Sequence, residues 1–315
     1  MDYDNFLENV CKGVQDICAP GETVSIKRVL KNNSVELDGL YVTGGNSNIA
    51  PTVYLNSFYD DFCGGRSMED IVDTVARVEK ENRVECSLEV GDFLTFEKIK
   101  DRIIFKLVNT AENKKLLLEV PNRPFLDLSV IFLIFIDKSE GGMATTVIHD
   151  NHMNKWNITE NELYELALSN MRRIFIPDLR GMEDLLREML ICDSVSSELE
   201  REILDEIESR NVAPMYVLTN HNKVYGATGM LYEDLLGEFA KEHGSFYILP
   251  SSIHELILVP DACGVNSDSL LDMVTEVNLT QVAKEEVLSD NIYYYDSDSG
   301  TLGLINKINN NVINT

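Results

Sequence analysis

Two serines, a histidine and a glutamate stand close together in the stretch Pro250-Ser-Ser-Ile-His-Glu255, which interrupts an apolar part of the chain. A serine hydrolase needs a hydroxyl nucleophile, an imidazole that takes its proton, and an acid that orients the imidazole. All three residue types are present here. Ser251, Ser252, His254 and Glu255 are therefore the candidate catalytic residues.

The order of these residues argues against a local catalytic triad. On an extended strand, His254 points to the face opposite Ile253 and Glu255. The chain also lacks a Gly-x-Ser-x-Gly elbow that would expose a nucleophile. The structural alternative is that Pro250 kinks a strand, the serines satisfy freed backbone groups, and His254 packs with its nitrogens hydrogen-bonded. We expect this structural role, although a polar break between strands is also a place where a pocket can form.

A second pair of chemically capable side chains is His149 and His152, with Asp150 between them in sequence. On a helix the two imidazoles would share a face and could bind a metal ion. A zinc site needs a third protein ligand, and none stands nearby in the sequence. His149 and His152 are thus the candidate metal ligands, while we expect no metal and no cofactor.

Two further motifs predict turns rather than binding sites. Asp296-Ser-Asp-Ser-Gly300 has the composition of a calcium loop, but Lys307 stands where the loop needs its twelfth-position glutamate. Gly64-Gly-Arg-Ser67 opens a helix and could hold an anion on helix amides, yet it lacks the lysine and preceding strand of a P-loop. We expect a hairpin turn and a helix cap.

The charge balance limits the classes of partner. The chain has 53 Asp and Glu against 27 Lys and Arg, a net charge of -26. Such a protein is repelled by phosphate backbones and anionic membranes, so we expect no direct nucleic-acid binding and no membrane association. The N-terminus is acidic where a secretory signal is basic, and the six cysteines form no Cys-x-x-Cys. We expect a cytoplasmic protein whose partner is a protein or a small molecule; the oligomeric state stays open.

The periodicity of apolar residues predicts an α+β fold. Amphipathic helices are expected from Asp2 or Asp4 to Ile17, from Ser67 to Glu81, and after the capping box Thr159-Glu-Asn-Glu162. Strands are expected in these segments: Thr23–Leu30 and Val35–Val42 as a hairpin, Ala50–Leu55, and Phe125–Ile136 as a buried strand or, alternatively, a buried helix. The pattern favours mixed or antiparallel sheets with covering helices in two α+β units, 1–155 and 156–315, with a boundary near Trp156. The alternative is that the two units pack as one domain.

The second half shows the most regular alternation of element signals. Its expected elements are a helix from Ser197, a hairpin of Tyr216–Thr219 and Val224–Thr228 around Asn220–Lys223, a helix ending at Gly244, strands Phe246–Leu249 and Ile253–Val259, a helix Ser267–Val277, a short helix Val282–Leu288, a hairpin across Asp296–Gly300, and a frayed tail from Asn306.

Several phrases, taken in order, resemble a known family. They are Asp101–Asn109, Pro124–Leu128, Trp156–Leu166, Tyr216–Asn220, Tyr247–Glu255 and Val287–Asp290. Together they are similar to the uncharacterised proteins of anaerobic, mostly gut-dwelling Gram-positive bacteria grouped as domain of unknown function 5688. The resemblance covers nearly the whole chain and implies a bacterial origin, but it brings no catalytic residues.

These observations favour a non-catalytic cytoplasmic protein that acts as an interaction or regulatory module. One alternative is a hydrolase-like enzyme with its site near Ser251 and His254. The other is an acidic mimic of nucleic acid, or an inhibitor of a basic partner.

Overall fold

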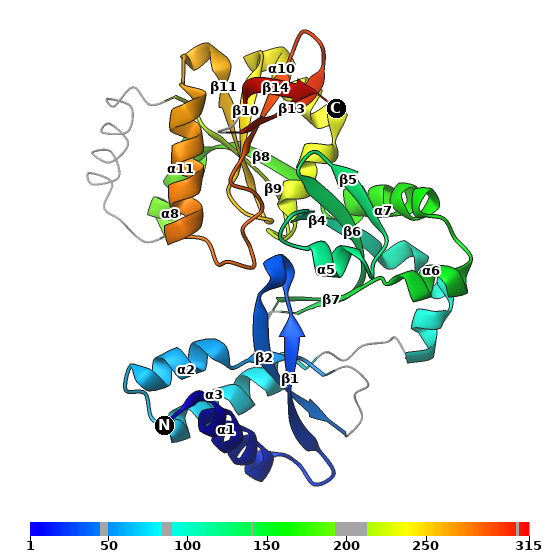
Figure 1. Cartoon of the computed structure of the whole chain (residues 1–315), viewed down its shortest axis with the longest axis vertical. Helices are drawn as coiled ribbons and strands as arrows, with labels where there is room; N and C mark the ends of the chain where they lie inside the picture. The colour runs from blue at the N-terminus through cyan, green and yellow to red at the C-terminus, as the bar shows by residue number, and fades with distance from the viewer. Residues whose placement is uncertain (45–49, 84–89, 140–141, 193–212, 307–308, 315) are drawn as a thin grey trace. The chain divides into compact units, whose positions relative to one another are not determined.

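The computed structural model describes residues 1–44, 50–83, 90–139, 142–192, 213–306 and 309–314. It confirms an α+β fold in which helices cover antiparallel sheets (Figure 1). The chain divides into two compact units: unit 1 is Met1–Ile104 with Leu133–Leu166, and unit 2 is Phe105–Phe132 with Ala167–Thr315. The boundary near Trp156 stays a prediction.

Unit 1 begins with helices packed on a three-stranded sheet. Its elements are α1 (Tyr3–Ile17), β1 (Thr23–Leu30), η1 (Asn32–Ser34), β2 (Glu36–Thr43), β3 (Val53–Tyr54), α2 (Asn56–Cys63), α3 (Met68–Glu81), η2 (Val90–Leu94), α4 (Phe96–Ile99), η3 (Lys100–Arg102), β7 (Gly142–Val147) and α6 (Asp150–Trp156). Three elements cross the division between the units: β4 (Ile103–Asn109), β6 (Leu128–Ser139) and α7 (Glu160–Ile174).

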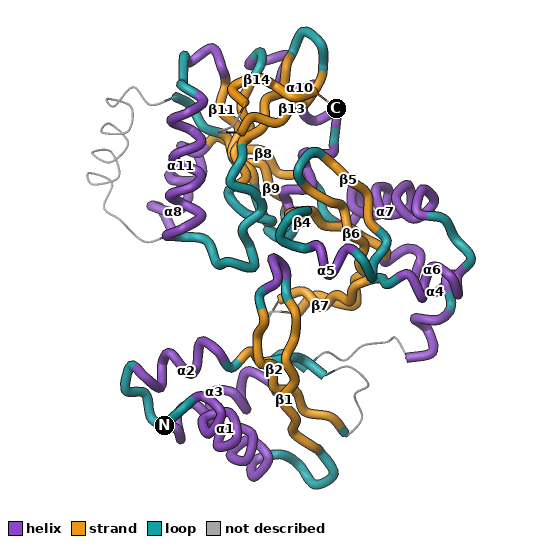
Figure 2. Tube along the Cα trace, viewed as in Figure 1, coloured by secondary structure: helices purple, strands orange, loops and turns teal. Residues whose placement is uncertain are grey.

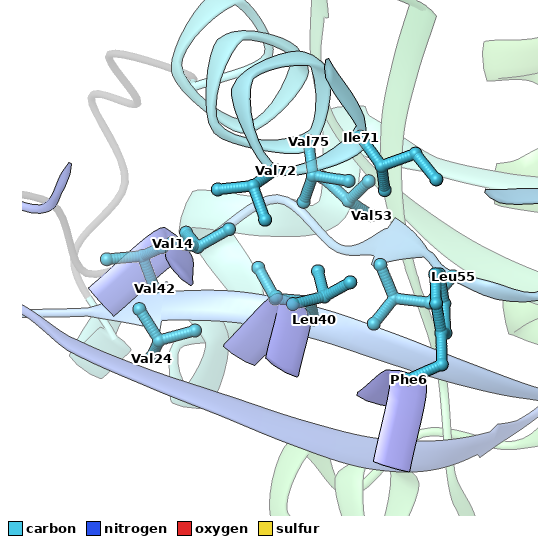
Figure 3. Close-up of a cluster of buried hydrophobic side chains, with 11 residues drawn as sticks. Phe6, Val14, Val24, Leu40, Val42, Val53, Leu55, Ile71, Val72 and Val75 are labelled. Carbon is cyan, nitrogen blue, oxygen red and sulfur yellow. The ribbon is translucent and has the colours of Figure 1, made fainter. Parts of the chain in front are cut away.

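Alternate residues of β2, Leu40 and Val42, enter the core of the three-stranded sheet. The sheet has the order β1-β2-β3, with Val24 opposite Val42 and Leu40 opposite Val53. These side chains meet Val14 of α1 and side chains of α3 in one apolar interior (Figure 3). Its fully or nearly fully buried members are Phe6, Val10, Val14, Val24, Leu40, Val42, Val53, Leu55, Ile71, Val72 and Val75.

The predicted helix caps are present. The Asp2 carboxylate accepts a hydrogen bond from the amide of Asn5 at 2.9 Å, and Ser67 caps α3. At α7, the Glu162 carboxylate accepts from the Thr159 amide at 2.8 Å, while the Thr159 hydroxyl accepts from the Glu162 amide at 3.3 Å. Each cap satisfies amides that the first helical turn leaves without a partner.

A charged triad joins α3 to the start of β1 in unit 1. The Arg83 guanidinium lies 2.6 Å from Glu22 and 2.9 Å from Glu79, whose side chains are only 9% and 3% exposed. Hydrogen bonding to Arg83 lowers the pKa of Glu22. Arg83 therefore compensates two carboxylates that would otherwise be buried without a cation.

We expect Arg83→Met to destabilise unit 1 by about 2 kcal/mol, below the 3–5 kcal/mol of a fully buried pair because Arg83 is about one-third exposed. Urea unfolding followed by the fluorescence of Trp156, the only tryptophan, measures this loss of stability.

The stabilisation by the triad depends on pH. Because the pKa of Glu22 is lowered, this stabilisation is complete above the ordinary carboxyl pKa and is lost as the pH falls through the pKa of the folded state. The control is Arg77→Met, which removes an exposed pair with Glu81 and should cost less than about 0.5 kcal/mol. Equal effects at the two positions would refute the role of the triad.

The central strand of the second sheet, β6, confirms the predicted buried strand over the alternative of a buried helix, but it begins at Leu128 and not at Phe125. This sheet has the order β4-β6-β5, and β7 pairs with β6. Residues 128–134 of β6 are all buried, which explains their continuous apolar character. In unit 2, Phe125 of β5 (Asn122–Phe125) pairs with Leu128 of β6, so Leu126 and Asp127 form a two-residue turn. Leu126 has a φ of 55°, as the first position of such a turn requires.

Unit 2 is built around a seven-stranded sheet of order β14-β13-β12-β10-β11-β9-β8. Figure 2 shows strands in orange and helices in purple. The remaining elements of unit 2 are α5 (Lys114–Leu117), β8 (Pro177–Gly181), α8 (Met182–Cys192), β9 (Tyr216–Asn220), η4 (Gly226–Leu231), α10 (Glu233–His243), β10 (Phe246–Pro250), β11 (Leu256–Pro260), η5 (Asp261–Cys263), α11 (Ser267–Thr280), β12 (Ile292–Asp296), β13 (Thr301–Asn306) and β14 (Asn309–Asn314).

Helices cover both faces of this sheet. Phe246 of β10 contacts Phe239 of α10, with ring centroids 4.8 Å apart. Leu249, on the opposite face of the same strand, packs in a cluster with Leu270 and Val274 of α11. This alternation along β10 is the expected pattern of a strand buried on both faces.

Several predicted elements are wrong. Residues 224–228 form no strand: Lys223 and Tyr225 have positive φ, and a 3-10 helix starts at Gly226. The Asn220 side chain donates to the Val224 carbonyl at 2.8 Å, so a side-chain hydrogen bond stabilises a turn where a strand would pair through its backbone. The segment 282–288 contains no helix, β8 was not predicted, and the tail includes β14. The helix predicted from Ser197 lies outside the described residues.

Candidate functional site

The stretch 250–255 is a hairpin loop rather than a kinked strand. β10 and β11 pair antiparallel up to Pro250 opposite Leu256, so residues 251–255 connect them. The loop is closed by the Ser252 amide, which donates to the Glu255 carbonyl at 3.2 Å. The expectation that Ile253–Val259 forms one strand is therefore wrong for residues 253–255, because Pro250 is followed by a turn back into the sheet.

The loop brings the four candidate residues near one another without forming a triad. The Ser251 hydroxyl donates to the Glu255 carboxylate at 3.3 Å. The Ser252 hydroxyl accepts from the His254 backbone amide at 3.0 Å. In the described chain, neither hydroxyl bonds the imidazole of His254. Both serines satisfy groups of their own turn, as short hydroxyl side chains commonly do.

The imidazole of His254 is held by residues from a distant loop of unit 2. Its Nδ1 accepts a hydrogen bond from the backbone amide of Tyr225 at 3.2 Å. The Tyr225 ring stacks on it, with centroids 6.0 Å apart and planes inclined by 12°. The backbone carbonyl of His254 accepts from the Thr219 hydroxyl at 2.9 Å. Thus the loop after β9 and the β10–β11 loop are joined through His254.

Charged residues complete the surroundings of His254. Its Nε2 lies 3.6 Å from the Glu286 carboxylate, and the Lys106 ammonium lies 5.6 Å from the centre of the Tyr225 ring. The side chain of His254 is 28% exposed. Burial lowers the pKa of His254; Glu286 and Glu255 oppose this shift, and Lys106 adds to it. The imidazole is therefore held mainly neutral at neutral pH.

This geometry decides what His254 can do chemically. A neutral imidazole has one free lone pair, and here that lone pair is on Nδ1, where it accepts from the Tyr225 amide. The proton consequently resides on Nε2, facing Glu286. A general base needs its lone pair free to take a proton from the nucleophile. His254 in this state orients a loop and does not activate Ser251 or Ser252.

The candidate metal ligands occupy the start of α6 in unit 1. The His152 Nδ1 accepts from the His149 amide at 3.0 Å, and its ring stacks on Trp156 with centroids 5.4 Å apart. Burial lowers the pKa of His152. Among the described residues, no group of three or more His, Cys, Asp or Glu side chains could hold a metal ion. The geometry gives the pair a capping role.

A polar centre of unit 2, built around Asp127, escaped the sequence analysis. Asp127, in the β5–β6 turn, accepts from the Tyr293 hydroxyl at 2.8 Å, the Ser289 hydroxyl at 2.6 Å and the Asn291 side-chain amide at 2.9 Å. The Asn109 side chain adds a bond to the Leu288 carbonyl at 3.1 Å. This Asp127 centre ties the segment 105–132 to the C-terminal sheet.

The sequence carried weak signals for these partners. One signal was Gly226, which lay inside a predicted strand. A glycine at such a position often marks a place where another backbone segment comes close. Here a Cβ at Gly226 would lie 2.3 Å from the His254 carbonyl oxygen. Glu286 lay in a predicted helix, and nothing in the sequence linked Asp127 to residues more than 160 positions later.

The described part of the chain has no helix with the length and apolar character needed to cross a membrane. The fold and the site define an α+β protein in which two polar clusters, one around His254 and one around Asp127, join segments of the backbone. No curated protein and no solved structure matches the chain significantly.

The chain belongs to the family of unknown function DUF5688, which matches residues 3–297. Membership confirms the family that the sequence phrases resemble. Two of those phrases, Pro124–Leu128 and Val287–Asp290, meet at the Asp127 centre. The bacterial origin implied by the resemblance stays an expectation.

Proposed function

We propose that this chain is a non-catalytic binding protein of the cytoplasm that acts as an interaction or regulatory module. The observation that carries the proposal is the hydrogen bond from the Tyr225 amide to His254 Nδ1, which occupies the lone pair that the imidazole would need as a general base. The thiols of Cys11, Cys18, Cys63 and Cys263 are free, which supports a reducing compartment.

A fluorophosphonate probe, which labels activated serines covalently, tests this proposal against the hydrolase alternative. We expect no labelling of Ser251 or Ser252 in the native full-length chain, because in the described chain neither hydroxyl is hydrogen-bonded to the imidazole of His254. The control is the Ser251→Ala/Ser252→Ala double variant. Labelling of the native chain that this variant loses would contradict the proposal.

The binding side of the proposal needs its own experiment. The full-length chain, biotinylated at one terminus, is incubated with a lysate of its native cell, cross-linked and analysed by mass spectrometry. We expect a stoichiometric partner whose complex re-forms from the two purified proteins. A chain that retains no partner reproducibly, and forms none with purified candidates, would overturn the proposal.

A further inference from the structure

Strand β1 of unit 1 is an edge strand with a free side. It is the first strand in the order β1-β2-β3, and its whole length pairs with β2. The Lys31 amide, just beyond β1, donates to the Val35 carbonyl at 2.7 Å and thus points toward β2. Backbone groups alternate in direction along an antiparallel strand, so the even-numbered residues of β1 point their amides and carbonyls away from the sheet.

Contacts at one end of β1 support this assignment. The Val24 amide donates to the Gln15 side chain at 2.9 Å, and the Cys11 thiol lies 3.9 Å from the Val24 carbonyl oxygen. Both partners come from α1, on the side of β1 opposite β2. Two α1 side chains therefore take the place of a neighbouring strand at Val24.

The rest of the edge has no such partner. Within the described chain, no hydrogen bond engages the backbone amides or carbonyls of Ile26, Arg28 and Leu30 on this side. Arg28 and Leu30 are exposed, and Ile26 is half-buried. An edge of this kind is a template for pairing with another strand.

A groove runs beside this free edge. It has a volume of about 690 Å³ and lies between α1 and β1, lined by Asp4, Leu7, Glu8, Cys11, Lys12, Gln15 and Ile26. Its floor includes the apolar side chains of Leu7 and Ile26. A helix and a free strand edge flanking a groove form the geometry in which extended peptides bind by strand addition, with backbone pairing on one side and side-chain pockets on the other.

The charges around the groove indicate the charge of the segment that binds there. Asp4 and Glu8 are exposed along its α1 side. Arg28, on the edge, already pairs with Asp38 at 3.4 Å and Glu36 at 3.7 Å. Lys12 alone remains among the lining residues to oppose the two carboxylates, because Lys27 and Lys31 project from the opposite face of the sheet, over Tyr41 and Tyr54. With a net charge of -26 on the whole chain, the groove favours a segment that carries basic side chains.

We propose that β1 accepts an extended segment of a basic partner protein as an additional strand, with alternate side chains of that segment in the α1–β1 groove. The proposal rests on the proposed binding function and gives it a surface and a partner chemistry. Ile26, Arg28 and Leu30 supply the backbone hydrogen bonds. The basic side chains of the segment enter the groove, where their aliphatic stems contact Leu7 and Ile26 and their cations pair with Asp4 and Glu8.

Fluorescence anisotropy with synthetic peptides tests the backbone pairing. The probe is a fluorescein-labelled nonapeptide that alternates lysine with valine. Two further peptides carry N-methyl groups either on every lysine or on every valine, and so block opposite edges of an identical strand. We expect one of the two to bind the full-length chain at least about tenfold more weakly and the other to bind like the parent. Equal binding of all three would overturn strand addition.

Protein variants locate the site. Arg28→Pro removes an outward amide without touching the ladder to β2, while Arg28→Ala keeps that amide and removes the same side chain. We expect the proline variant to bind the lysine–valine peptide at least about tenfold more weakly than the alanine variant. A peptide that alternates glutamate with valine should bind the native chain at least about tenfold more weakly as well. Equal affinities of the two variants, or of the two peptides, would overturn the site or its charge preference.

Sedimentation and partner capture separate the remaining outcomes. A native dimer that Arg28→Pro converts to a monomer would identify a second copy as the occupant and overturn the basic partner. A partner captured equally by native chain and Arg28→Pro would overturn this inference and leave the binding function standing. Absence of any partner would instead refute the binding function itself.

Discussion

Replacing Asp127 with asparagine is expected to destabilise unit 2 by about 3 kcal/mol. The carboxylate accepts three hydrogen bonds, from Tyr293, Ser289 and Asn291. Asparagine has the same shape but replaces one carboxylate oxygen with an NH2 group. The donors that bind that oxygen, either Tyr293 or the pair Ser289 and Asn291, then lose their acceptor. Loss of a hydrogen bond to a charged group costs about 1.5–3 kcal/mol, and a buried orphan donor adds to that loss.

The Tyr293 hydroxyl makes the Asp127 centre especially sensitive. Tyr293 is fully buried, and burial together with the Asp127 carboxylate raises its pKa well above the ordinary value, so it remains a donor at every physiological pH. In the double variant Asp127→Asn/Tyr293→Phe, the Tyr293 hydroxyl, which Asp127→Asn leaves without its acceptor, is absent. We therefore expect the two substitutions to be less than additive, as contacting residues are in a double-mutant cycle.

Urea unfolding followed by tyrosine circular dichroism measures this loss. The control is Asp298→Asn at the exposed β12–β13 turn, whose side chain makes no hydrogen bond in the described chain and whose replacement should change stability by less than about 0.5 kcal/mol. A loss at Asp127 no larger than at Asp298 would show that the Asp127 centre does not hold unit 2 together.

Replacing Gly226 with alanine is expected to cost about 3 kcal/mol or to prevent the folding of unit 2. The new Cβ would lie 2.3 Å from the His254 carbonyl oxygen and 2.7 Å from the Thr219 Cα. The first atom belongs to the backbone of the β10–β11 loop and the second to the backbone of strand β9, so neither can move aside without disturbing the hydrogen bonds of the loop or the sheet. Overpacking of this kind commonly costs about 1–3 kcal/mol and more where the backbone must shift.

Gly237 provides a matched control in the same unit. It lies inside α10, and a Cβ there would meet only the Tyr295 hydroxyl at 3.6 Å. Gly237→Ala should therefore be neutral or stabilise by up to about 1 kcal/mol, because alanine favours the helix. Hydrogen exchange adds a local readout: Gly226→Ala should expose the Tyr225 amide. Equal stability of the two variants would contradict the close approach.

The sequence predicted those features that depend on neighbours in the chain. The caps at Asp2, Ser67 and Thr159 need only a side chain and an amide three residues away, and all three are present. The buried strand β6 was recognisable from its continuous apolar run. The hairpin turn at Asp296–Gly300 follows from local turn chemistry in the same way, with the Gly300 amide on the Asp296 carbonyl at 2.8 Å.

The candidate site was predictable only in part because its partners are remote. The sequence located the polar segment at Ser251–Glu255, yet Tyr225 and Glu286 reach His254 through the tertiary fold. The predicted strand Val224–Thr228 is wrong because the Asn220 side chain binds the Val224 carbonyl and stabilises a turn, although the apolar residues that follow alternate as in a strand.

The pattern of bonds at His254 leads to the central claim that its imidazole joins two loops and is not a catalytic base. Nitrogen-15 NMR of the imidazole, assigned with a His254→Gln variant, tests this claim most directly. We predict the tautomer protonated at Nε2, with Nδ1 as acceptor, and a pKa below the ordinary value of about 6.5. Because that pKa is lowered, protonation favours the unfolded chain, and the native chain should lose stability as the pH falls below about 6.5. A tautomer protonated at Nδ1, or a pKa at or above the ordinary value, would contradict the claim.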